Sequence, residues 1–214
     1  VSYMIENREI MMRMFPELFQ TINIEPVENY SSYLLDILKS LAPKKCEDDP
    51  KIVILTPGPL NSAYYEHSFL ADTMGVELVQ GTDLLVENNI TFMRTTKGKE
   101  RVDIIYRRID DDFIDPLSFN QSSVIGIPGL FDSYRTGNVN ICSAPGSGIA
   151  DDKAIYSYMP EIIRFYLGQE PILPSIKTWR CGNEKDKQYV LNNLEKLVVK
   201  EVHGSGGYGM LIGS

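Results

Sequence analysis

The sequence predicts an α/β fold built on a Rossmann-like parallel sheet, followed by a smaller α+β part. A β-branched run at 51–56 is separated by one helix length from an apolar run at 76–79, which is the βαβ signature of a parallel sheet. A glycine-rich loop near the end of the sequence stands between two apolar, strand-like runs. Hydrophobic residues make up 43% of the 214 residues and charged residues 23%, so the chain has enough apolar surface to bury a core.

The first fifty residues are predicted to be mainly helical. Apolar residues recur at helical spacing over 3–19, with a break or kink expected near Pro16, and again over 30–41. Residues 44–50 are polar and are expected to form a loop. This part therefore precedes the predicted sheet as a separate helical segment.

The central part is predicted to hold most of the strands. Asn61 is expected to cap a helix that runs to about Met74, and Gly75 is expected to end it. Turns are expected at 88–89 and 97–98. The predicted strands of this part are 51–56, 76–79, 83–86, 91–95, 102–106, 124–127 and 139–142.

The last part is predicted to contain two helices and a hairpin. The first helix covers 151–167 and is expected to be capped by Asp151 or Asp152, whereas the second covers 186–196 and is expected to be capped near Asp186. Two strands at 197–202 and 210–212 are expected to enclose the glycine-rich loop.

Composition excludes several classes of partner. The formal net charge is −8 at pH 7 and no stretch is basic enough to follow a phosphate backbone, so nucleic-acid binding is not expected. No run approaches the roughly 18 consecutive apolar residues of a membrane helix, so no membrane partner is expected. The three cysteines lie far apart and there are only two histidines, which favours a reducing, cytoplasmic location over a disulfide framework or a zinc site.

The glycine-rich loop is the strongest functional signal. Gly204, Gly206, Gly207 and Gly209 surround Ser205 and Tyr208 within six residues. Glycines let backbone amides wrap a phosphate without a side chain in the way, and Lys200 just before the loop is placed to meet that phosphate. The loop is flanked by two predicted strands, whereas a dinucleotide fingerprint and a Walker loop each lie between a strand and a helix. The sequence therefore argues against both of these motifs. The alternative is a glycine-rich hairpin turn without function.

Two further motifs place basic side chains where a ligand would lie. Lys153 follows a loop of small residues at a helix start, where the helix dipole disfavours a cation unless an anion compensates it. Arg107 and Arg108 end a predicted strand and are followed by three aspartates, and ligands of α/β proteins bind at the carboxyl ends of strands. Surface charge pairing explains both motifs equally simply, and both interpretations stay open.

Weaker candidates lie elsewhere in the chain. Glu6 and Asn7, at the end of a possible strand, offer oxygen ligands of the kind that Mg²⁺ takes, although a polar helix start is the simpler interpretation. The loop at 56–62 follows a strand in a βαβ unit and is a possible substrate contact. His67 lies in the middle of a helix and is interpreted as structural.

Taken together, these motifs resemble the circularly permuted ATP-grasp family, type 2. The resemblance covers most of the chain, and its motifs occur in the expected order at 3–8, 106–117, 146–153, 168–174 and 199–210. It implies three segments: a helical permuted ATP-grasp remnant (1–50), a Rossmann-like pre-ATP-grasp domain with a parallel sheet (51–145), and part of the α+β ATP-grasp domain, its first lobe, truncated (146–214).

The resemblance also implies a nucleotide site. In this family two lysines contact ATP and a glycine loop covers its phosphates. By motif match these residues would be Lys153 and Lys200, with the loop residues Gly204, Ser205, Gly206, Gly207, Tyr208 and Gly209. Mg²⁺ would be held by Glu6 and Asn7, which are adjacent here whereas one residue separates them in the family pattern.

The activity that the resemblance implies is ATP-dependent ligation of a carboxylate and an amine through an acyl phosphate. Arg107 or Arg108 would hold the substrate carboxylate or stabilise the acyl phosphate, and the substrates would be small or peptide-like. Because the sequence starts with Val1 and stops after an apolar run, it is expected to be a fragment that is inactive alone. The alternative is a non-catalytic, nucleotide-binding module of the same fold.

Overall fold

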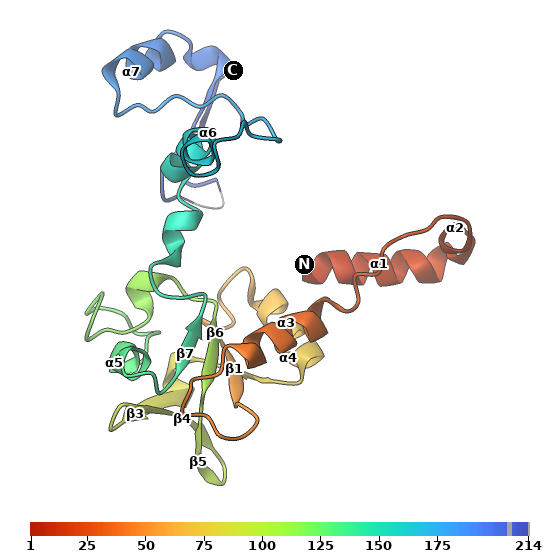
Figure 1. Cartoon of the computed structure of the whole chain (residues 1–214), viewed down its shortest axis with the longest axis vertical. Helices are drawn as coiled ribbons and strands as arrows, with labels where there is room; N and C mark the ends of the chain where they lie inside the picture. Colours follow the sequence, from red (N-terminus) through yellow and green to blue (C-terminus); the bar gives the residue numbers. More distant parts are fainter. Residues whose placement is uncertain (205–206, 214) are drawn as a thin grey trace. The chain divides into compact units, whose positions relative to one another are not determined.

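The computed structural model describes residues 1–204 and 207–213. The chain forms two compact units, Val1–Pro145 and Gly146–Ser214 (Figure 1). Unit 1 contains the helical segment and the main sheet, and unit 2 contains the glycine-rich loop. The assignment of separate roles to 1–50, 51–145 and 146–214 stays a prediction.

A four-stranded parallel sheet is the centre of unit 1. Its strand order is β2-β1-β6-β7, and Ile54 at its centre pairs with Leu78 on one side and with Tyr106 on the other. The predicted α/β fold is therefore confirmed. The strands are β1 (Ile52–Leu55), β2 (Glu77–Val79), β6 (Ile104–Arg107) and β7 (Asn140–Cys142).

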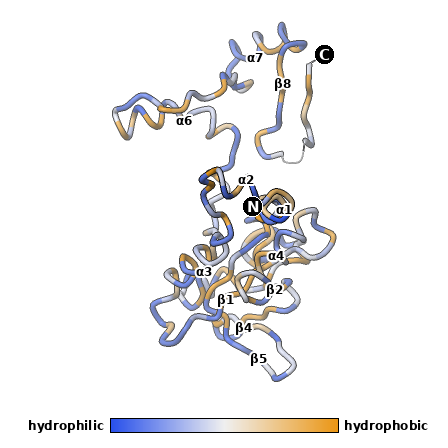
Figure 2. Tube along the Cα trace, turned by 90° about the vertical axis from the view of Figure 1, so that its right-hand side faces the viewer, coloured by the Kyte–Doolittle hydropathy of each residue, from blue (hydrophilic) through white to orange (hydrophobic). Residues whose placement is uncertain are grey.

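Both faces of this sheet are covered, which explains why β1 reads as an unbroken apolar run. Side chains alternate along a strand, so Val53 and Leu55 join one core cluster while Ile52 and Ile54 join another. The run is hydrophobic along its whole length in Figure 2. Helices α3 (Tyr30–Ser40) and α4 (Tyr64–Met74), which contact each other, cover the second cluster. The first cluster combines α5 (Leu130–Arg135) with residues of the antiparallel sheet described next and of loops (Figure 1).

An antiparallel sheet interrupts the parallel one between β2 and β6. It consists of β3 (Leu84–Glu87), β4 (Ile90–Thr95) and β5 (Gly98–Arg101) in that order. Asn88 and Asn89 take positive φ values of 51° and 60°, so the predicted turn between β3 and β4 is confirmed. Strand β5 was not predicted, because its sequence is polar and lacks apolar alternation.

The predicted strand at 124–127 is wrong. The segment belongs to the connection between β6 and α5 and folds back on an earlier part of it, where the amide of Ile127 donates to the carbonyl oxygen of Ile114 at 2.8 Å. Ile127 is fully buried in the core while Val124 is 87% exposed. A short apolar run does not distinguish such a core-filling loop from a strand.

Close backbone approach at Gly126 gives a testable consequence. A Cβ atom there would lie 2.2 Å from the carbonyl oxygen of Phe113, so Gly126→Ala forces backbone to move. We expect a loss of about 1–3 kcal/mol of unfolding free energy in urea denaturation. Gly182→Ala is the control, since no atom lies within 4 Å of the added carbon. Equal stability of the two variants would show that the backbone around Gly126 accommodates the added methyl group without cost.

The remaining elements follow the predicted order. Pro16 opens a new helix after the break at Phe15, so the kink expected there is a helix boundary. Gly75 ends α4 in the left-handed region, as predicted, but the cap before α4 is Ala63, with Asn61 accepting its amide. The elements are α1 (Ser2–Met14), α2 (Pro16–Thr21), α6 (Lys153–Leu167), α7 (Glu184–Leu191), β8 (Val198–Val199), β9 (Leu211–Ile212) and the 3₁₀ turns Gly81–Asp83, Asp111–Phe113, Ser147–Ala150 and Leu194–Lys196.

In unit 2, the predicted cap of the second helix is wrong by three residues. Asn183 caps α7 by accepting the amides of Lys185 and Asp186, so the helix begins before Asp186. The Asp186 side chain accepts the backbone amide of Arg180 instead, at 3.1 Å. Helix α7 also ends earlier than predicted, and a 3₁₀ turn follows it.

Candidate functional site

The glycine-rich loop joins two antiparallel strands, as predicted. Val198 pairs with Ile212 and Val199 with Leu211, so β8 and β9 are shorter than the sequence indicated. Gly207 and Gly209 take φ values of +83° and +62°, a region that side chains disfavour. Ser205 and Gly206 of the predicted site lie outside the described residues.

Lys153 is brought against the start of this loop. It is the first residue of α6, and its Nζ donates to the carbonyl oxygens of Val202, at 3.4 Å, and Gly204. The preceding Asp152 caps the helix by accepting the amide of Ala154 at 2.7 Å. The carboxylate and the two carbonyl groups thus offset the unfavourable position of a cation at the helix start.

Other polar groups surround the same junction within unit 2. Lys200 is exposed directly after β8, and no ion pair to it occurs in the described part of the chain. Tyr208 at the loop is 82% exposed. His203 Nδ1 lies 3.5 Å from Asp152 Oδ2, an ion pair only when the imidazole is protonated. The structure therefore places Lys153 against the start of the loop and Lys200 just before it, with the carboxylate of Glu201 beside Gly209.

In unit 1, Arg107 is fully engaged by the protein itself. Its side chain is 9% exposed and pairs with Asp111 Oδ1 at 2.6 Å. It also donates to the carbonyl oxygens of Ser143 at 2.6 Å, Ile109 at 2.7 Å and Ala144 at 3.3 Å. This geometry favours the structural interpretation of Arg107, which ties β6 to the segment after β7.

Arg108 is different. Its amide donates to the carbonyl oxygen of Leu55 at 2.7 Å, which fixes its backbone beside the end of β1, but its side chain is exposed. The guanidinium lies 5.8 Å from the ring centroid of Tyr106. Within residues 1–204 and 207–213, no carboxylate pairs with it. Of the two predicted arginines, Arg108 is the one that is available to a ligand.

Beside this edge, a buried histidine supports the loop after β1. His67 on α4 is 2% exposed, and its Nδ1 lies 2.9 Å from Thr56 Oγ1. Thr56 Oγ1 also accepts the amide of Gly58 at 3.2 Å, so its own hydrogen is available to His67. Nδ1 then acts as the acceptor, which places the ring hydrogen on Nε2.

The ionisation of His67 makes the stability of unit 1 depend on pH. Burial lowers the pKa of His67 below 6.5, the positive charge of Arg108 lowers it further, and Glu66 opposes both. The unfolded chain therefore takes up a proton more readily than the folded one. The contribution of neutral, buried His67 to the unfolding free energy is therefore complete above about pH 6.5. It is lost as the pH falls through the pKa of His67 in the folded chain.

We expect the unfolding free energy of the native chain to fall from about pH 7.5 to about pH 5.5, where ordinary carboxylates stay ionised. His67→Gln should remove this part of the pH dependence, and His203→Gln should not, because His203 is exposed. Urea denaturation of the three proteins across this range measures the effect. A parallel decline in native chain and His67→Gln would contradict the assignment.

The predicted magnesium ligands lie on a helix, not at the end of a strand. Glu6 and Asn7 are consecutive residues of α1, so their side chains leave the helix about 100° apart. Among the described residues no group of three or more His, Cys, Asp or Glu side chains is arranged to hold a metal ion. Because Mg²⁺ takes six oxygens in a near-octahedral shell, this pair by itself does not fit a magnesium site.

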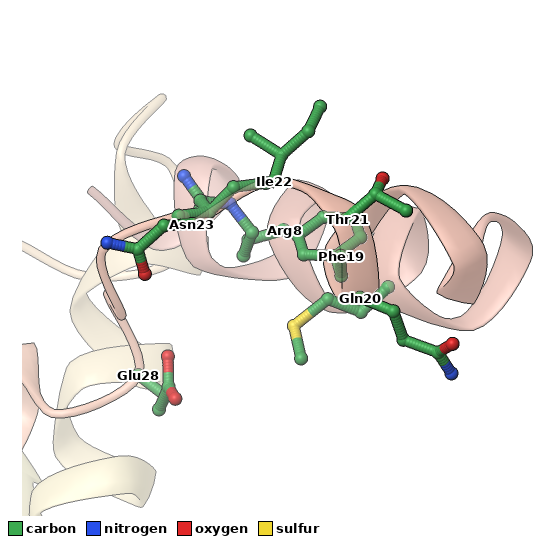
Figure 3. A pocket seen from close by; sticks show the side chains of 9 residues that line it. Arg8, Phe19, Gln20, Thr21, Ile22, Asn23 and Glu28 are labelled. Atoms are coloured by element: carbon green, nitrogen blue, oxygen red, sulfur yellow. The ribbon is translucent and has the colours of Figure 1, made fainter.

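A hollow of about 500 Å³ lies between α1, α2 and the segment that follows them. Its lining side chains, shown in Figure 3, mix polar and apolar groups and include Arg8, whose Nη1 donates to the carbonyl oxygen of Glu25 at 2.9 Å. None of the residues predicted for nucleotide or substrate lines it. Within unit 1 it is therefore distinct from the carboxyl edge of the sheet.

Sequence reasoning missed two features of unit 1. The link between Thr56 and His67 joins residues whose partnership depends on how α4 packs on the sheet, and His67 had been interpreted only as a helix residue. Asp115, in the acidic motif, is completely buried and accepts three backbone amides, from Leu117, Gly129 and Phe131. An apolar neighbour on each side, Ile114 and Pro116, was the only local signal for its burial.

Comparison with known proteins identifies a family and several relatives. The family model described as "A circularly permuted ATPgrasp" matches residues 1–214. Uncharacterized proteins of Synechocystis sp. (sll0335) and Mycobacterium tuberculosis (Rv2411c) are 54% and 50% identical over 213 residues. A Frankia alni protein with the name "Putative glutamate--cysteine ligase 2-3" is 38% identical.

Each match covers the whole of this chain but only 44%, 38% and 25%, respectively, of the relative. The chain thus spans less than half the length of these relatives. None of the described helices combines the length and the apolar character that crossing a bilayer requires.

Proposed function

The chain belongs to the circularly permuted ATP-grasp family, and on that premise we propose that the protein is an ATP-dependent ligase that joins a carboxylate to an amine. The predicted family is thereby confirmed, while the type 2 assignment stays a prediction. Relatives that carry ligase names support the class of reaction. The observation that carries the proposal is the convergence of Lys153 on the glycine loop.

The nucleotide would bind in unit 2. Lys153 and Lys200 would neutralise its phosphates, and backbone amides of the loop would bind the terminal phosphoryl group (Gly204, Ser205, Gly206, Gly207, Tyr208 and Gly209). On binding, Lys153 exchanges carbonyl partners for phosphate oxygens, so the loop and the lysine adjust together. Such a site acts through positioning and charge neutralisation, without a protein nucleophile.

The proposed chemistry has two steps. A carboxylate oxygen of the acid attacks the γ-phosphorus of ATP, so that an O–P bond forms and the bond to ADP breaks. The amine then attacks the acyl carbon, a C–N bond forms, phosphate leaves, and the nitrogen gives up its proton. Arg108 is the candidate for binding the acid, since Arg107 is held by Asp111 and three carbonyl groups.

Magnesium supplies charge neutralisation to ATP in reactions of this kind. Glu6 is retained as a proposed ligand, but no step is assigned to it, because the pair with Asn7 does not complete a site. A cytoplasmic location also stays a prediction from the cysteine pattern.

Isotope transfer tests the proposal directly. Acids labelled with ¹⁸O in the carboxylate are incubated with Mg-ATP, an amine and the protein, and the released phosphate is analysed by mass spectrometry. An acyl phosphate mechanism moves one ¹⁸O into inorganic phosphate. Label in AMP would indicate an acyl adenylate instead. If ATP binds saturably but no ADP forms with any of the acids and amines tested, the alternative of a non-catalytic, nucleotide-binding module is favoured.

A further inference from the structure

The hollow beside α1 is lined by none of the residues proposed above for the nucleotide, the acid or the metal (Figure 3). Its volume of about 500 Å³ is within the range of about 300–1,000 Å³ that is usual for small-molecule sites. Side chains of α1, of the end of α2 and of the segment 22–28 line it. It is therefore large enough for a small metabolite, and all of its lining belongs to unit 1.

The segment 22–28 is tied down at two points. The amide of Ile22 donates to the carbonyl oxygen of Leu18 at 3.0 Å, so the segment leaves directly from the end of α2. The carbonyl oxygen of Glu25 accepts a hydrogen bond from Arg8 Nη1 at 2.9 Å, between residues 17 positions apart. Residues of the chain between these two points line the hollow, so its shape is set by a long-range contact.

The lining carries one positive and one negative side chain, which do not pair with each other. Among the described residues that line the hollow, Arg8 is the only basic one and Glu28 the only acidic one. Glu28 Oε2 accepts the amide of Val27 at 2.9 Å, and within residues 1–204 and 207–213 neither charged side chain forms an ion pair. The nearby acid Glu9 is bound by Arg13 at 3.3 Å. The hollow thus presents two opposite charges that a ligand can pair with.

Most of the other lining side chains are apolar. These are Met12, Phe19, Ile22 and Ile24. A simple anion would pair with Arg8 only and a simple cation with Glu28 only, and neither would cover the apolar wall. We propose that the hollow binds a free α-amino acid with an apolar side chain, its carboxylate on Arg8 and its ammonium group on Glu28. This binding site goes beyond the proposed ligase function and does not depend on it.

Leucine and two analogues of nearly the same shape separate the contributions of the two charges. Leucinamide lacks the carboxylate, and 4-methylpentanoate lacks the ammonium group. Each is titrated without ATP into the full-length protein, labelled with ¹³C at the methionine methyl groups, and Met12→Leu assigns the NMR signal of Met12. Leucine should shift this signal saturably and bind about fivefold more tightly than either analogue, because each analogue loses one charged contact in an open site. Met11 does not line the hollow, so its signal is the internal control.

Glu28→Gln should abolish the preference for leucine over 4-methylpentanoate and retain the preference over leucinamide, while its amide oxygen can still accept the Val27 amide. Glu25→Gln is the matched control and should retain both preferences, because the exposed Glu25 side chain does not line the hollow. Leucinamide, in place of a variant, tests Arg8, since Arg8 also holds the backbone of Glu25.

Three results would overturn the proposal. They are the absence of a saturable Met12 shift with leucine, equal affinity for leucine and either analogue, and an unchanged preference over 4-methylpentanoate in Glu28→Gln. A shift of Met11 as large as that of Met12 would also do so, because it would place the ligand outside the hollow. The titrations involve neither ATP nor the residues proposed for ligation, so their failure is distinct from failure of the isotope-transfer test.

Discussion

Asp115→Ala is expected to lower the unfolding free energy by about 2–4 kcal/mol, the largest effect that we expect of a single substitution in unit 1. The carboxylate is completely buried. Its Oδ1 accepts the amides of Leu117 at 2.9 Å and Gly129 at 3.1 Å, and its Oδ2 accepts the amide of Phe131 at 2.9 Å. Alanine would leave all three donors without an acceptor in a partly buried place.

The mechanism of this loss is specific to α5. Phe131 is in the first turn of that helix, where amides have no partner within the helix, so Asp115 acts as its cap from a distant part of the chain. Asp115→Asn keeps the shape and one acceptor oxygen, and should be destabilised less than Asp115→Ala. Urea denaturation measures the loss, and hydrogen exchange should show α5 opening first.

Asp112→Ala is the matched control, because Asp112 belongs to the same acidic run but its side chain is exposed. It should change the unfolding free energy by no more than about 0.5 kcal/mol. If Asp112→Ala destabilised the protein as much as Asp115→Ala, the cost would come from the charge of the run and not from the buried acceptor.

The fold was predictable wherever local signals agree with tertiary packing. The run 52–55 is apolar throughout because both of its faces are buried, and Gly75 and Asn88-Asn89 have the backbone conformations that their residue types favour. The segment 124–127 resembles a strand in composition, but it packs against the backbone of residues 113–114, an earlier part of the same β6–α5 connection. No local pattern reports that close approach.

The sequence predicted which residue types belong to the candidate site, but not the role of each residue. The arginine pair was visible, but only the fold separates Arg107, enclosed by carbonyl groups and Asp111, from Arg108, which remains exposed. Glu6 and Asn7 were expected at the end of a strand, but they lie in helix α1, in agreement with the helical spacing of apolar residues in this segment. The role of His67 depends on a partner eleven residues away, a separation that sequence periodicity does not encode.

The same contrast between enclosed and exposed side chains decides which lysine best tests the nucleotide site. Lys153 contacts the loop, but its removal would also release the carbonyl groups of Val202 and Gly204, so loss of ATP binding could reflect loss of loop structure. Lys200 is exposed directly after β8, and no described residue forms an ion pair with it. Its removal changes the charge near the loop without removing a described contact.

We therefore expect Lys200→Ala to weaken Mg-ATP binding about ten- to a hundredfold, because a charge-assisted contact to phosphate contributes about 1.5–3 kcal/mol. Lys196→Ala is the control. Its Nζ lies 3.4 Å from Glu195 Oε1 with both side chains exposed, so its loss should change affinity by less than about 0.5 kcal/mol. Calorimetric titration of Mg-ATP into both folded variants measures the difference. Equal affinities would remove Lys200 from the site, and the nucleotide would then have to be bound by Lys153 and the loop backbone alone.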